Sequence, residues 1–176
     1  ATVWSTSASR SRHRGGKESI VTFLRTWWLR LLLAGVAAFL LIQLVPYGVD
    51  NPSARDEPAW DSPQTRELAV RACYDCHSNE TDLLWFEKVA PVKWYVANHV
   101  KEGRAALNFS EWSTNAGEEA DDAGEAVDEG GMPVGGYASV GRHRGAKVSP
   151  AEVRAVVGGL ERTVAADPPA GGEGWA

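Results

Sequence analysis

Cysteine and methionine are scarce in this sequence of 176 residues, which contains two Cys and one Met. Two cysteines are too few for a disulfide-rich scaffold or a four-thiolate metal site. The sequence also lacks the alternation of apolar and polar residues that is typical of strands, and it has no internal repeat. Its length fits one domain of ordinary size and excludes two large ones. We therefore expect a small, mainly α-helical protein.

Basic residues are scarce beyond residue 30. Residues 1–30 contain six Lys and Arg and one acid, whereas residues 31–176 contain twelve basic and twenty-two acidic residues. A nucleic-acid-binding domain needs Lys and Arg clustered on a folded face, so this acidic body predicts no nucleic-acid partner.

Charge is absent from Leu31 to Val49, a run of nineteen residues. As a helix this run would be roughly 28 Å long, close to the thickness of a bilayer core. Gln43 is the one polar side chain between Leu31 and Val45, so the stretch lacks the polar face of a soluble core helix. Aromatic residues suited to the headgroup layer flank it at Trp27, Trp28 and Tyr47. The sequence predicts a transmembrane anchor over residues 21–47 in a lipid bilayer.

The basic tail predicts the orientation of this anchor. Positive charge tends to stay on the cytoplasmic side, so residues 1–20 should be cytoplasmic and the protein single-pass in the cytoplasmic (inner) membrane. A cleaved signal peptide is the rival interpretation, but the apolar stretch is too long and no clean small-x-small site follows it. Everything from about residue 48 onward should then be periplasmic, where two free thiols would not normally remain free.

The exported part divides into a linker at 48–61, a helical domain at 62–166 and a flexible tail at 167–176. The first helix should run from Ser62-Pro63 to about Cys76, because Ser is a favoured N-cap and Pro a favoured first residue. A second should begin at Ala90-Pro91, with an apolar face listed as Val92, Val96, His99 and Val100.

A third helix should begin at Ser149-Pro150, where Ser149 and Glu152 have the spacing of a capping box. Its apolar stripe comprises Val153, Val156, Val157, Leu160 and Val164. Residues 113–131 are rich in Gly, Ala and acids, and are either a poor helix or a solvated loop. So few helices make a thin core, which predicts a large prosthetic group or a partner that supplies apolar area.

Residues 73–77 form a Cys-x-x-Cys-His sequence, the pattern that attaches haem through two thioether bonds. Two intervening residues bring Cys73 and Cys76 to one side of a helix end, where both sulfurs can reach the vinyl groups of one porphyrin. His77 then projects beneath the ring and binds the iron. The alternatives are a thioredoxin-like dithiol, which needs a β-α-β context, a simple disulfide, and half of a zinc site, which needs a second ligand pair.

Three downstream residues are candidates for the second axial ligand. Met132 is the one methionine and lies in a Gly-Gly-Met-Pro loop, a setting that can present a side chain to the distal face of a haem. His99 is the main competitor, because His/Met and His/His are both common axial pairs. His143 lies between two Arg residues and is expected at the surface or near a propionate. Aromatic residues near these blocks should wall the pocket: Tyr74, Trp85, Phe86, Trp94, Tyr95, Phe109 and Trp112.

Three blocks of the sequence together resemble the single-haem "haem-binding domain" family of membrane-anchored bacterial c-type cytochromes. The blocks are CYDCHSNET, VAPVKWYVANHVKEGRAALNFSEW and GMPVGGYASVGRHRGAKVSPAE. The resemblance covers about residues 62–163 and implies a helical cytochrome c domain with one covalent haem c on Cys73 and Cys76 and iron on His77. The family's Met-Pro element falls on Met132-Pro133, and its later His falls on His143. Val134 departs from the family pattern, in which a second Pro is usual.

A haem with both axial positions filled by protein has no open site for a substrate, so we expect an electron carrier rather than an enzyme. Its expected partners are a respiratory or photosynthetic membrane complex, a soluble redox carrier, or both. Two alternatives stay open: an accessory haem subunit without an essential redox role, and a sensor of small ligands.

Overall fold

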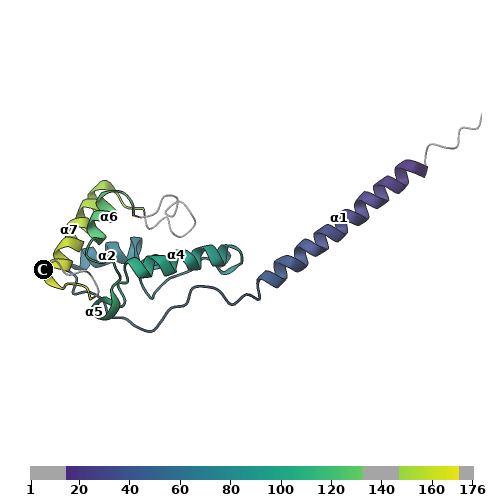
Figure 1. The fold of residues 1–176 in the computed structure, drawn as a ribbon. Coiled ribbons are helices and arrows are strands. Elements are labelled where there is room, and N and C mark those ends of the chain that lie inside the picture. Colours follow the sequence, from purple (N-terminus) through teal and green to yellow (C-terminus); the bar gives the residue numbers. More distant parts are fainter. Residues whose placement is uncertain (1–14, 133–146, 171–176) are drawn as a thin grey trace, which may run out of the picture. The chain divides into compact units, whose positions relative to one another are not determined.

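The structure, a computed structural model, describes residues 15–132 and 147–170 (Figure 1). The chain divides into two compact units, residues 1–45 and residues 46–176. Within the described residues the regular structure is helical and no strand is present. The predicted fold class, mainly α-helical with one N-terminal helix of membrane-spanning length, is confirmed.

The first unit contains one long helix, α1 (Gly15–Ile42). Its stretch Arg25–Ile42 is the one part of the described residues that is long and apolar enough to cross a membrane, by length and composition. None of this stretch is buried by protein, which distinguishes it from the core helix of a soluble domain. Large side chains along it, such as Leu31 and Leu41, are exposed. An apolar surface of this extent needs another protein or lipid to cover it.

The second unit begins its helical part with α2 (Pro63–Ala72) and α3 (Tyr74–His77). The hydroxyl of Ser62 caps α2 by accepting a hydrogen bond from the amide of Thr65 at 3.2 Å. The sequence predicted one helix here, but the chain breaks at Cys73, whose φ of −118° departs from the helical value. Cys73 thus ends α2 and begins the short helix that carries Cys76 and His77.

Two further elements follow, η1 (Trp85–Lys88), a single 3₁₀ turn, and α4 (Val92–Ala106). The start of α4 directly after Ala90-Pro91 agrees with the prediction. Glu87 stabilises η1, because its buried carboxylate accepts a hydrogen bond from the amide of Leu84 at 2.7 Å. Helix α4 packs against both η1 and α3.

The acidic segment, for which the sequence left loop and helix open, contains the short helices α5 (Trp112–Asn115) and α6 (Ala123–Asp128). The last helix, α7 (Pro150–Ala166), lies beside α6 and α2 (Figure 1). The predicted capping box at its start is confirmed. The amide of Ser149 donates to the Glu152 carboxylate at 2.8 Å, and the amide of Glu152 donates to the Ser149 hydroxyl at 3.3 Å.

A cluster of aromatic rings forms the centre of the core. Phe109 is fully buried, and its ring centroid lies 5.2 Å from that of Trp60 and 5.7 Å from that of Tyr74. Trp112 stacks on Phe109 at 6.0 Å. Leu68 of α2 and three residues of the predicted α7 stripe, Val156, Leu160 and Val164, complete this cluster.

Residues 48–61, predicted as a linker, lie within the second compact unit. Asn51 and Thr81 exchange two hydrogen bonds at 2.9 and 3.1 Å. Asp56 pairs with the α5 region, because its amide donates to the Ser110 carbonyl and its carbonyl accepts from Trp112, both at 2.9 Å. These bonds join groups that are distant in sequence, so the composition of the segment gives no sign of them.

The start of the predicted flexible tail is also held by the domain. Asp167 accepts hydrogen bonds from the amide of Ala59 at 2.7 Å and from the indole of Trp112 at 2.9 Å. The amide of Ala170 donates to the Trp112 carbonyl at 2.8 Å. Residues 167–170 therefore belong to the packed domain, and residues 171–176 lie outside the described residues.

Candidate functional site

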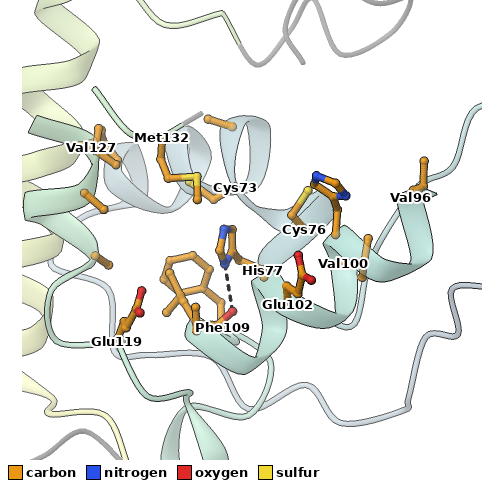
Figure 2. Close-up of a pocket in the computed structure, with 18 of the residues that line it drawn as sticks. Cys73, Cys76, His77, Val96, Val100, Glu102, Phe109, Glu119, Val127 and Met132 are labelled. Carbon is orange, nitrogen blue, oxygen red and sulfur yellow. Dashed lines mark hydrogen bonds between the residues drawn. The ribbon is translucent and has the colours of Figure 1, made fainter. Parts of the chain in front are cut away.

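The second unit contains a cavity of about 660 Å³, whose walls come from α2, α3, η1, α4, α6 and α7 (Figure 2). Apolar side chains form most of the wall. The face of α4 predicted from sequence is the face that the cavity uses, since it is lined by Val92, Val96, His99 and Val100. A space of this size suits a large apolar ligand.

Cys73, Cys76 and His77 all line this cavity. His77 is 8% exposed, and its Nδ1 lies 3.1 Å from the carbonyl oxygen of Leu107 (Figure 2). A carbonyl can only accept, so Nδ1 carries the proton and Nε2 keeps its lone pair for a metal. Burial lowers the pKa of His77 and so favours the neutral imidazole that ligation requires.

Both cysteines are free thiols with strongly perturbed acidity. Burial raises the pKa of Cys73 to about 12 and that of Cys76 to about 11, so both remain protonated at neutral pH. A thioredoxin-like dithiol needs the opposite shift. The zinc alternative also lacks support, because residues 15–132 and 147–170 contain no group of three or more His, Cys, Asp or Glu side chains that could hold a metal ion.

Gly103 of α4 is a site residue that the sequence analysis missed. A Cβ placed there would lie 2.8 Å from the backbone carbonyl oxygen of Cys76, closer than real Cβ contacts allow. Only glycine lets α4 approach α3 this closely, and Gly103 also lines the cavity. An isolated glycine within an otherwise helical pattern was the available signal.

Met132 lines the same cavity and is 37% exposed. The chain reverses after α6 at Gly130, whose φ of +74° lies in the left-handed region that favours glycine. The amide of Met132 then donates to the Ala126 carbonyl at 3.1 Å. These two features bring Met132 back to the cavity wall. Pro133, the second residue of the Met-Pro element, and Val134, which departs from the family pattern, lie outside the described residues.

His99 also lines the cavity, from α4. The Nδ1 of His99 lies 3.0 Å from the Tyr95 carbonyl, so the Nε2 of His99 is available, as in His77. The centroid of the His99 ring lies 4.2 Å from that of the Tyr95 ring. The cavity therefore contains both candidates for a second axial ligand. His143, the third candidate, lies outside the described residues.

The aromatic residues expected in the pocket wall divide into two groups. Phe86, Tyr95 and Phe109 line the cavity. Tyr74 instead packs behind Phe109 in the core, and Trp94 is partly buried but does not line the cavity. Among the described residues, those that line the cavity include three acids and no Lys or Arg. The described lining residues therefore offer no ion pair to the propionates of a haem.

The donors fit haem better than the alternatives: two protonated thiols, an oriented imidazole and a choice of thioether or second imidazole open on one apolar cavity. The model of a haem-binding domain family matches residues 37–162 of the chain. No curated protein and no solved structure matches it. With most of the chain covered by the family model, and with the site assembled inside the covered range, the chain belongs to the haem-binding domain family.

Proposed function

We propose that this protein is a membrane-anchored c-type cytochrome that transfers single electrons on the periplasmic side of the cytoplasmic membrane. It holds one covalent haem c, because the sequence has one Cys-x-x-Cys-His site. It works as, or with, a subunit of a larger respiratory or photosynthetic complex. When bound, the haem supplies reversible one-electron chemistry at its iron.

The observation that carries this proposal is the meeting of His77 and a second donor in one cavity. The Leu107 carbonyl orients the His77 ring and leaves Nε2 for the iron. Met132 or His99, which line the same cavity, would hold the iron together with His77. A haem held by two residues of the chain would have no free coordination site for a substrate, which favours electron transfer over catalysis.

The core residues contribute by packing against the wall of this pocket. Phe109 is fully buried and links the cavity wall to Trp112 and Trp60. A rigid apolar pocket reduces the rearrangement that accompanies a change of charge at the iron, and it limits solvent access that would shift the potential.

A redox titration of the purified full chain, followed by absorption, tests the proposal. We expect a reversible transition that fits one electron, no binding of carbon monoxide or azide by the resting protein, and no turnover of peroxide. Binding of these ligands without mutation would instead favour the second candidate, a small-ligand sensor. That candidate is supported by the 37% exposure of Met132, because an exposed ligand exchanges more easily.

The anchor is tested separately in spheroplasts that carry a tag before residue 1. The exposed apolar stretch Arg25–Ile42 and the basic residues before it support a cytoplasmic N-terminus. Added protease should degrade the haem domain and spare the tag. Loss of the tag with protection of the haem domain would reverse the topology.

A further inference from the structure

One end of the haem domain carries an exposed aromatic ring that neither the core nor the cavity uses. Trp85 is 79% exposed, although indole rings are normally well buried in soluble domains. It does not line the cavity, so a bound cofactor would not cover it. Its ring packs edge-on against Phe86 at 5.7 Å, and Phe86 does line the cavity. Trp85 is therefore available to an external partner.

Basic side chains accompany this ring. Lys88 closes η1 and is exposed, and Lys93 follows in the first turn of α4. A pair of backbone hydrogen bonds ties these residues into one surface, because Val89 donates to Phe86 at 3.2 Å and accepts from Lys93 at 2.9 Å. We call this surface, formed by Trp85, Lys88 and Lys93, the η1 face.

A short connection joins the residues beside the η1 face to the apolar helix. Gly48 lies against the Lys93 side chain, where an added Cβ would contact Cδ at 3.5 Å. Five residues separate Gly48 from Ile42, the last residue of α1. Even fully extended, this connection spans at most roughly 20 Å. If α1 spans a bilayer, this connection is short enough to let the η1 face reach the headgroups.

Charge along α4 distinguishes its two ends. The acidic segment meets the C-terminal end, where the amides of Glu118 and Glu119 donate to Ala105 and Ala106 at 3.0 and 2.9 Å. The η1 face lies at the N-terminal end, about 22 Å away along a helix of fifteen residues. An anionic surface would attract the η1 face and repel the acidic end.

We propose that the η1 face rests on the anionic phospholipid surface, with Trp85 at headgroup level and Lys88 beside lipid phosphates. Trp and Lys are the side chains that settle at this depth of a bilayer. The inference rests on the proposed membrane anchor. In this orientation the part of the cavity wall that contains Phe86 would face the membrane, where electrons would be exchanged with a membrane-embedded partner.

Lysine labelling of the full-length holoprotein in nanodiscs tests this, because the chain contains matched controls. Lys101 and Lys147 are exposed like Lys88 but lie off the η1 face. A water-soluble amine reagent, with mass spectrometry, should modify Lys88 about fivefold more slowly in phosphatidylglycerol nanodiscs than in detergent. The modification rates of Lys101 and Lys147 should be similar in phosphatidylglycerol nanodiscs and in detergent. In phosphatidylcholine nanodiscs the protection of Lys88 should be smaller.

Trp85→Gln should return Lys88 to its reactivity in detergent, and an unchanged haem spectrum would show that the variant is folded. Should the variant fail to fold, the comparison between the two lipids still decides. Equal protection of Lys88 and Lys101 in phosphatidylglycerol nanodiscs, or equal protection of Lys88 in the two lipids, would overturn the proposal. So would protection seen only in native membranes, which would assign the face to a protein. A chain that enters nanodiscs with Lys88 unprotected refutes this inference alone, whereas one that stays outside them refutes the anchor as well.

Discussion

At the scale of single residues, one hydrogen bond decides which nitrogen of His77 can bind a metal. The Leu107 carbonyl, thirty residues further along the chain, holds Nδ1 at 3.1 Å. The Cys-x-x-Cys-His pattern predicted His77 as a ligand, but a backbone carbonyl has no sequence signature. The orientation of the ring therefore follows only from the three-dimensional structure.

Gly103→Ala should weaken both the fold and the haem site. The new methyl group would press on the Cys76 carbonyl, 2.8 Å away, and push α4 from α3. We expect a loss of about 1–3 kcal/mol in unfolding free energy, typical of overpacking, together with less haem per chain. Thermal unfolding and the haem-to-protein absorbance ratio measure these effects.

Gly158→Ala is the matched control, because a Cβ there would meet only the far end of the flexible Arg162 side chain. Alanine also has the higher helix propensity, so this variant should be at least as stable as the wild type. Equal behaviour of the Gly103 and Gly158 variants would show that close packing of α4 on α3 is unimportant.

Met132→Ala and His99→Ala should separate the two candidates for the second axial ligand. A thioether favours ferrous iron more than an imidazole does, so a His77/Met132 pair should have the more positive potential. The oxidised wild type should then show a weak far-red sulfur-to-iron band. Met132→Ala should abolish this band, lower the potential and admit external ligands.

His99→Ala should leave that band in place. Absence of the band in the wild type, together with an iron that opens only in His99→Ala, would assign the ligand to His99. The Met132 loop would then only cover the cavity.

At the scale of elements, the sequence predicted the features that depend on interactions between residues close together in the chain. The caps at Ser62 and Ser149 and the apolar face of α4 depend on neighbours within one or two turns, and the structure contains all three. The packing of residues 50–61 depends on distant partners. Arg104 illustrates this, since it donates to the Ser78 carbonyl at 2.8 Å and to the Asp50 carbonyl at 2.9 Å.

The start of α7 should make stability depend on pH. Hydrogen bonds from Arg71 and from Ser149 lower the pKa of Glu152 from 4.5 to about 2. A carboxylate with a lower pKa in the folded state stabilises the fold above its unfolded pKa and loses that effect as pH falls through the folded value. Glu152→Gln should therefore reduce the melting temperature by a few degrees at pH 7, and the difference should shrink between pH 4.5 and 2.

Glu118→Gln provides the comparison for this experiment, since it removes an exposed carboxylate from the acidic segment. Its melting temperature should stay close to that of the wild type over the same pH range. A Glu152→Gln deficit that persists undiminished at pH 2 would mean that packing, and not the charge, holds α7 against α2.

At the scale of the whole molecule, the sequence divides its charges and its apolar surface between two units. Basic residues precede an exposed apolar helix, and an acidic helical domain follows it. That domain has a small core beside a cavity of about 660 Å³, which agrees with the expectation that a prosthetic group supplies missing apolar area. Folding of the domain should therefore depend on the haem, and Cys76→Ala should accumulate poorly.

The central claim, one haem attached covalently through Cys73 and Cys76, is tested most directly by the intact mass of the full chain after acid-acetone extraction. We expect the mass of the polypeptide plus one haem, with haem-dependent peroxidase staining retained on a denaturing gel. A polypeptide that loses its haem completely to the extraction, and has the mass of the bare chain, would contradict it.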